Sequence, residues 1–165
     1  CRIACQETGG VVQVANYNSP DQIAISGDKP TLERAMALAK ERGARRVIPL
    51  PVSAAFHSPL IEPIVNEFRQ AVEKASLQEA AIPVVANASA RPLTRVEDIK
   101  QEMVKQLTAS VRWSESVQYM IGQGVTRFVE IGPKDVLTGL IRRTDKSVET
   151  TNVGGVEGVG AFLEI

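Results

Sequence analysis

VVQVANYNSPDQIAIS, residues 11–26, predicts two strands joined by a turn, at 11–15 and 22–26. The intervening Asn-Tyr-Asn-Ser-Pro-Asp is rich in residues that favour turns, and β-branched and apolar residues flank it. Upstream, Gly9 and Gly10 are suited to ending a helix. Downstream, apolar residues at helical spacing predict a helix that starts from an N-cap at Thr31 and stops at Gly43.

A third strand is predicted at 46–52, near a sheet edge because Pro49 and Pro51 interrupt it. A helix end followed by strand, strand, helix and strand makes up most of a ferredoxin-like lobe, without its first strand. We therefore assign residues 1–54 to an incomplete ferredoxin-like small subdomain.

Residues 55–165 alternate between helices and short strands, which is typical of an α/β layered lobe. Helices are predicted at 59–76, 96–107, 114–123 and from Gly132-Pro133 to about 143. Strands are predicted at 82–86, as a short buried strand, at 127–131 and at 149–153, before a Gly-rich C-terminal segment. The fold class is therefore α/β.

The composition is that of a soluble globular chain, with 44% apolar and 23% charged residues. Formal net charge is zero and there is no long basic tract, so nucleic acid and membrane surfaces are not predicted as partners. No apolar run approaches the roughly 18–20 residues that span a bilayer.

Cys1 and Cys5 have the spacing of small apolar residues on one helix face. A metal site there would need further ligands, and the sole histidine lies far along the chain, so no metal is predicted. The cysteine usage fits a reducing cytoplasm. Because the chain opens on Cys rather than Met, we expect a fragment.

The sole histidine, His57, follows a predicted strand and precedes Ser58-Pro59, a typical helix start. Loops at strand ends carry many catalytic groups in α/β folds, and histidine is the commonest general base. The alternative is a structural loop histidine that caps the following helix. The residue types alone leave both open.

Four stretches resemble malonyl-CoA:acyl carrier protein transacylases and the acyltransferase domains of polyketide synthases. VSAAFHSPL (52–60) resembles the active-site histidine motif, and ANYNSPDQIAISG (15–27) resembles an Asn-containing loop and strand of the family. Val111-Arg112-Trp113 and VEIGPKDVLTGL (129–140) resemble two later signatures. The resemblance covers essentially the whole chain, in order. It implies that residues 55–165 are the C-terminal part of the large subdomain, an α/β-hydrolase-like acyltransferase core.

By this resemblance, the parent enzyme moves a malonyl group from coenzyme A to the thiol of acyl carrier protein, for fatty acid biosynthesis or polyketide synthesis. An acyl-serine is the intermediate, His57 is the general base, and the backbone carbonyl of Gln106 orients it. Asn18 would line the substrate cleft, and Phe56 would select malonyl over α-substituted groups. Each of these three residues also has a purely structural explanation: Gln106 as an exposed helix residue, Asn18 as a turn residue and Phe56 as a core aromatic. No cofactor is implied, since the coenzyme A thioester is a substrate.

Two positions depart from the family pattern, because Asp21 and Lys134 stand where glycine is common. A left-handed backbone at Lys134 would cost roughly 1 kcal/mol. Asp135 is a candidate cap for the helix that follows.

The sequence holds no Gly-x-Ser-x-Gly, the elbow that carries the nucleophilic serine. The serine, the oxyanion-hole donors and a malonate-binding arginine would then come from a missing N-terminal portion of the same enzyme, and we expect the isolated chain to be inactive. One rival interpretation is a non-catalytic fragment that binds carrier protein, with Arg42, Arg45 and Arg46 as a basic contact or merely a solvated face. Another is a fragment of a polyketide synthase acyltransferase domain.

Overall fold

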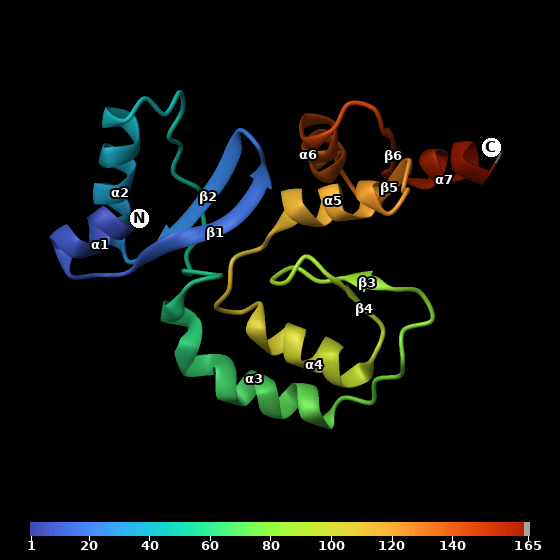
Figure 1. The fold of residues 1–165 in the computed structure, drawn as a ribbon, viewed down its shortest axis with the longest axis horizontal. Coiled ribbons are helices and arrows are strands. Elements are labelled where there is room, and N and C mark those ends of the chain that lie inside the picture. The colour runs from blue at the N-terminus through green and yellow to red at the C-terminus, as the bar shows by residue number, and fades with distance from the viewer. Residues whose placement is uncertain (164–165) are drawn as a thin grey trace.

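The computed structural model describes residues 1–163, in which three groups of elements are joined by extended segments (Figure 1). The first group is α1 (Arg2–Thr8), β1 (Val12–Ser19), β2 (Gln22–Gly27) and α2 (Lys29–Glu41). The second is η1 (Pro59–Ile61), α3 (Glu62–Lys74), β3 (Val84–Val85), β4 (Pro92–Leu93) and α4 (Val96–Lys105). The third is α5 (Trp113–Gly122), β5 (Arg127–Ile131), α6 (Val136–Thr144), β6 (Glu149–Val153) and α7 (Val156–Leu163). The predicted α/β class is confirmed.

The first group is an antiparallel hairpin of β1 and β2 with two helices packed beside it (Figure 1). Ala4, Val12 and Ala35 form its buried core, one from each of α1, β1 and α2. Gly9 ends α1 with a left-handed backbone (φ 73°), as the sequence predicted.

The N-cap of α2 is Asp28 rather than the predicted Thr31. The Asp28 carboxylate accepts hydrogen bonds from the backbone N–H of Thr31 and from that of Val11. Asp28 therefore joins the start of α2 to the start of β1, and Thr31, in the first turn of α2, is fully buried.

The strand predicted at 46–52 is wrong: this segment is extended without pairing to a strand. Pro49 and Pro51 have no N–H to donate, and the N–H of Val52 turns back to the carbonyl of Leu50 (2.8 Å). Ile48 is 67% exposed. The first group thus consists of one hairpin and two helices, without the third strand that the sequence predicted. The ferredoxin-like assignment of residues 1–54 stays a prediction.

The second group is built on the contact between α3 and α4. Val65, Val72 and Val104 form its buried core, with Phe68, Met103 and Leu107 packed around them. The strand predicted at 82–86 is reduced to the two residues of β3, paired with β4. The predicted segment is not buried either, since Ile82 is 79% exposed and Val84, in β3, is 53% exposed.

In the third group, β5 and β6 pair in parallel, and helix α6 connects them along the chain. Arg127 lies opposite Glu149 and Ile131 opposite Val153. Helices α5 and α6 and both strands agree with the prediction, although Trp113 begins α5 instead of preceding it. The Gly-rich C-terminal segment forms α7.

β1 is the junction between the first group and the rest of the molecule. Besides β2, it contacts residues 110–112, where Val111 forms a parallel bridge with Asn16. The N–H of Val111 donates to Ala15 O (2.8 Å), and the N–H of Tyr17 donates to Val111 O (2.9 Å). The segment that follows α4 is therefore fixed on β1.

None of the helices within residues 1–163 has the length and apolar character that crossing a membrane requires.

Candidate active site

His57 lies in the loop between the first two groups, immediately before η1. Its backbone is left-handed (φ 56°). The next residue, Ser58, is fully buried, and its hydroxyl donates to Ala55 O (2.6 Å) while it accepts from the N–H of Leu60 (3.3 Å). Ser58 is thus the N-cap of η1, and His57 is left free of the capping role that the structural interpretation gave it.

The imidazole of His57 is held by a backbone carbonyl. Its Nδ1 lies 2.8 Å from the carbonyl oxygen of Gln106. Gln106 is the C-cap residue of α4, where carbonyls lack a partner within the helix and remain free to accept. Because a carbonyl oxygen only accepts, Nδ1 carries the hydrogen of the neutral ring and Nε2 carries the lone pair. This arrangement leaves Nε2 able to take a proton.

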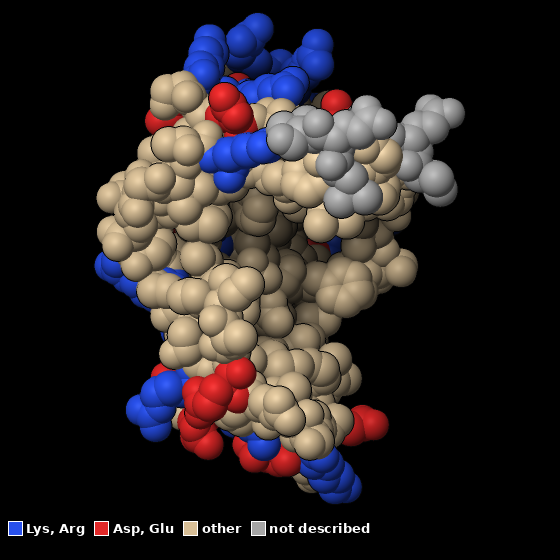
Figure 2. Space-filling view, turned by 90° about the vertical axis from the view of Figure 1, so that its right-hand side faces the viewer, with Lys and Arg blue, Asp and Glu red and all other residues tan. Residues whose placement is uncertain are grey.

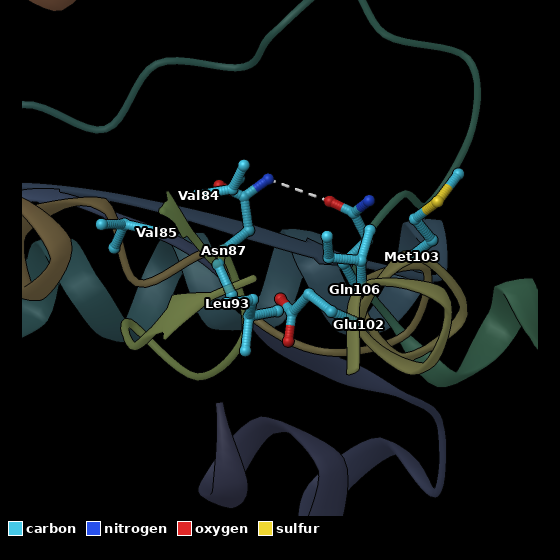
Figure 3. Close-up of a pocket in the computed structure, with 9 residues that line it drawn as sticks. Val84, Val85, Asn87, Leu93, Glu102, Met103 and Gln106 are labelled. Atoms are coloured by element: carbon cyan, nitrogen blue, oxygen red, sulfur yellow. Dashed lines mark hydrogen bonds between the residues drawn. The ribbon is translucent and has the colours of Figure 1, made fainter. Parts of the chain in front are cut away.

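The side chain of Gln106 also makes a contact, which the sequence did not indicate. Its Oε1 accepts a hydrogen bond from Nδ2 of Asn87 (2.9 Å), from the turn between β3 and β4 (Figure 3). Both residues line a groove of about 310 Å³ between the β3–β4 hairpin and α4, together with Val84, Val85, Ala86, Leu93, Ile99, Glu102 and Met103. Glu102 is tied down at the groove wall, where its carboxylate accepts from the N–H of Ala88. The residue that orients His57 is thus braced from the hairpin.

Gln13 is a second residue at the site that the sequence reasoning missed. It is half-buried on β1, and its Nε2 lies 2.5 Å from the carbonyl oxygen of His57 and 2.8 Å from that of Thr108. The available signal was a polar side chain between Val12 and Val14 in an otherwise apolar run.

Arg112 fixes the segment that joins Gln106 to α5. Its guanidinium hydrogen-bonds both carboxylate oxygens of Glu115 and also donates to Ser89 O (3.3 Å). The hydrogen bond to Glu115 raises the pKa of Arg112 above its ordinary value. The N–H of Arg112 donates to Asn87 O (2.8 Å), so this signature residue joins the β3–β4 hairpin to α5.

The two predicted substrate-binding residues belong to different parts of the chain, the loop that carries His57 and strand β1. Phe56 directly precedes His57 and is 55% exposed, so its ring does not fill a core. Asn18 is half-buried near the end of β1, at an irregularity in the pairing with β2. Among residues 1–163, no hydrogen bond joins Asn18 to His57.

Within residues 129–140, the N-terminus of α6 is capped by Glu130 and not by Asp135, the predicted cap. Asp135 occupies the N-cap position of α6 without a side-chain hydrogen bond, whereas Glu130 accepts from the N–H of Leu137 (3.0 Å) and Thr138 (2.7 Å). Partial burial raises the pKa of Glu130, but the hydrogen bonds from Thr138 and Leu137 together outweigh it, and the pKa is lowered. Lys134 is left-handed (φ 70°), the strained case that the sequence analysis considered.

The chemistry available here is proton transfer at one imidazole. Within the part of the chain that the structure describes, no three His, Cys, Asp or Glu side chains gather as metal ligands would. The sequence contains no Gly-x-Ser-x-Gly elbow.

Comparison with known proteins finds relatives over almost the whole chain. The sequence profile of the family described as "Acyl transferase domain" matches residues 1–160. The chain is 42% identical over 158 residues to a malonyl CoA-acyl carrier protein transacylase from Bacillus subtilis (strain 168), covering 96% of this chain and 50% of that protein. A relative of the same name from Staphylococcus aureus (strain COL) is 39% identical over 154 residues, covering 93% of this chain and 50% of the relative.

Solved structures give the same result for the fold. An acyl-carrier-protein-S-malonyltransferase from Bartonella henselae superposes with a TM-score of 0.93 at 38% identity, covering 99% of this chain and 52% of that one. A malonyl-transacylase solved in complex with its type II PKS acyl-carrier protein gives 0.94 at 35% identity, covering 98% and 53%. The chain thus spans about half the length of the relatives that it matches.

Proposed function

The chain belongs to the acyl transferase domain family, and on this basis we propose that it is part of an enzyme that moves a malonyl group from coenzyme A to the thiol of acyl carrier protein. The observation that carries the proposal is the hydrogen bond between His57 Nδ1 and the Gln106 carbonyl, which leaves Nε2 free to act as the base. Gln106 is an orienting group in this scheme, since a backbone carbonyl cannot itself exchange a proton.

In the proposed reaction, Nε2 of His57 accepts the hydroxyl proton of a serine that lies outside this chain. The serine oxygen attacks the malonyl thioester, and the coenzyme A thiolate leaves with the proton returned by His57. In the second half, Nε2 takes the proton of the carrier-protein thiol. The thiolate then attacks the acyl-serine, and His57 returns the proton to the serine oxygen.

The donor and acceptor substrates are proposed from the relatives. Two of them are named as malonyl CoA-acyl carrier protein transacylases, and a third was solved in complex with an acyl-carrier protein. We assign Phe56 and Asn18 to the malonyl-binding side of the site. The exposed ring of Phe56, next to the base, supports the assignment.

A further part of the same enzyme is proposed to cover the uncharged face of this chain. Figure 2 shows a face whose centre is hollowed and formed mostly by uncharged residues, with most of the Lys, Arg, Asp and Glu gathered above and below. Exposed apolar side chains occur throughout the chain, including Ile82 on the approach to β3 and Ile131, 83% exposed, at the end of β5. Where exposed apolar residues form a continuous patch, they mark a surface that interacts with a partner. Since the relatives have about as many residues again, their other half is the natural occupant.

A non-catalytic module that binds carrier protein is the second candidate. It is supported by Arg42, Arg45 and Arg46, all exposed beyond the end of α2, which would attract an acidic partner. A place in a polyketide synthase is a variant of the first proposal, with the same chemistry at His57.

The test uses a full-length transferase that contains this sequence. Replacing His57 with alanine is expected to lower the rate of malonyl transfer by roughly 10²–10⁴-fold, as for loss of a general base. The loop histidine lies outside both buried clusters, so folding should be retained. Transfer is followed by mass spectrometry of the carrier protein, and circular dichroism checks the fold.

Ser53→Ala, at an exposed position of the same loop, is the matched control and should transfer at the normal rate. Near-normal transfer by His57→Ala would exclude the proposed role. If the unmodified protein transferred no malonyl group but still bound carrier protein, and His57→Ala bound it equally well, the binding module would replace the transferase as the proposed function.

A further inference from the structure

Gln13 connects three parts of the chain that are distant in sequence. It lies on β1, and its two carbonyl partners are 44 residues away at His57 and 95 residues away at Thr108. Both partners can only accept a hydrogen bond. The amide nitrogen, rather than the amide oxygen, must therefore face them, and both of its hydrogens are used.

The first of these bonds acts on the backbone of the candidate base. His57 has φ 56°, in the left-handed region that residues other than glycine seldom occupy without support from their surroundings. The Gln13 amide donates to the carbonyl of His57 itself. That bond opposes rotation of the His57 peptide out of its unusual conformation, and the direction of the imidazole depends on this conformation.

The second bond acts on the group that orients the ring. Thr108 lies two residues beyond Gln106, in the turns that end α4, where the N–H groups of Thr108 and Ala109 both return to Lys105 O. Holding the Thr108 carbonyl keeps this tight turn against β1. The Gln106 carbonyl, 2.8 Å from Nδ1 of His57, is thereby kept in place.

We propose that Gln13 is a positioning residue: by donating to both carbonyls, it maintains the hydrogen bond from His57 Nδ1 to Gln106 and so keeps the neutral ring protonated at Nδ1, with Nε2 unprotonated. The inference deepens the proposed function, because only a base at Nε2 makes this tautomer useful. The competing explanation is that Gln13 only stabilises the fold, as a structural strut, and has no effect on the His57 ring. The tautomer of His57 distinguishes the positioning role from this structural role.

His57 is the only histidine in the sequence, so its ring nitrogens can be observed without assignment in the ¹⁵N-labelled 165-residue chain. Long-range ¹H–¹⁵N correlation spectra recorded at mildly alkaline pH report which ring nitrogen carries the proton of the neutral imidazole. The expected spectrum has a protonated Nδ1 and an unprotonated Nε2.

Gln13→Met keeps a similar volume and removes both donors. It is expected to shift the ring toward the Nε2-protonated form that free histidine prefers. Gln22→Met, at an exposed position on β2, is the matched control and should leave the Nδ1-protonated spectrum unchanged. Fluorescence of the single tryptophan, Trp113, checks that each variant is folded.

A folded Gln13→Met chain that keeps a fully Nδ1-protonated ring overturns the proposal in favour of the strut, and so does an Nε2-protonated ring in the unmodified chain. If Gln13→Met does not fold, Gln13→Asn decides in its place. This variant keeps an amide that is too short to reach both carbonyls, and the same shift is expected.

In a full-length transferase, Gln13→Met should also lower kcat by roughly 10–100-fold, as for a misplaced catalytic group, with KM for the thioester nearly unchanged. Absence of any malonyl transfer by the unmodified enzyme would remove the proposed function, yet it would leave the tautomer result intact.

Discussion

Three residues other than glycine have left-handed backbones within residues 1–163: His57, Ala90 and Lys134. At His57 the conformation is tied to a site, because its carbonyl is held by Gln13 and its ring by Gln106. At Lys134 the contact is made by the backbone alone, since Nδ2 of Asn152 donates to its carbonyl. The left-handed backbone at Lys134 is therefore strained by the presence of a side chain, and in the described part of the chain no hydrogen bond of that side chain stabilises the turn.

Replacing Lys134 with glycine should stabilise the chain by about 0.5–1 kcal/mol. Relief of the left-handed strain, roughly 1–2 kcal/mol, is partly offset by the greater freedom of glycine in the unfolded chain. Urea unfolding followed by Trp113 fluorescence measures the change. Lys146→Gly, in an exposed turn where φ is not positive, should instead destabilise the chain, and equal effects of the two substitutions would contradict the strain argument.

Phe56 directly precedes the proposed base and is exposed, so its ring does not fill a core and can be tested as a selectivity residue. In a full-length transferase, Phe56→Ser should open space for the α-methyl group of methylmalonyl. Discrimination by one methyl group is worth about 1–3 kcal/mol, or roughly 10–200-fold, and the ratio of kcat/KM values for the two thioesters should narrow within that range. A competition assay with both thioesters measures it, and an unchanged ratio would assign selectivity to residues outside this chain.

At the scale of elements, helices were predicted better than strands, and the reason is physical. The hydrogen bonds of a helix are internal, so apolar spacing and end residues suffice to predict α3, α4 and α6. A strand requires a neighbour. Residues 46–52 and 82–86 have strand-like composition, but pairing within residues 1–163 is absent for the first and limited to two residues for the second.

The N-cap of α2 gives a pH-dependent prediction. Hydrogen bonds from the backbone of Val11 and then of Thr31 lower the pKa of Asp28 below its ordinary value. The ionised carboxylate therefore contributes stability above the unfolded-state pKa of about 3.9, and this contribution is lost as pH falls through the lower folded-state pKa.

Asp28→Asn should consequently lower the urea midpoint at pH 7, and the difference from the unmodified chain should shrink as the pH is taken below about 4. Glu33→Gln, on the exposed side of α2, is the control and should leave the pH profile unchanged. If Asp28→Asn lowered the urea midpoint by the same amount at pH 7 and pH 3, the charge of Asp28 would have no effect on stability. Only the hydrogen-bonding geometry of the N-cap would then matter.

At the scale of the whole molecule, the resemblance predicted that His57 and Gln106 act together, and in the structure Nδ1 of His57 lies against the Gln106 carbonyl although the two are 49 residues apart. Gln13 and Asn87 were not predicted. Their roles depend on which carbonyl or amide lies opposite each side chain after packing, and neither residue type nor spacing encodes that register. Ser58 was considered only as part of a helix start, although its hydroxyl caps η1 and so leaves His57 without a capping role.

The 165-residue chain by itself is expected to transfer no malonyl group to carrier protein, because its sequence contains no serine elbow. The measurement is mass spectrometry of carrier protein after incubation with malonyl-CoA, with the intact Bacillus subtilis relative as the positive control. Product that persists through purification of the chain, and is lost in His57→Ala, would require a different nucleophile within these residues.

The attachment of residues 110–112 to β1 also has a consequence for the time at which the site appears during synthesis. The Ser110 hydroxyl reaches the Val14 carbonyl across 96 residues, a long loop to close. Chains emerge from the ribosome N-terminus first, so the β1–β2 hairpin and the histidine loop exist before Gln106 and its turn have been made. The imidazole of His57 then remains without its carbonyl partner until the polypeptide has grown past Arg112, so the proposed base acquires its working geometry well after its own loop has been made.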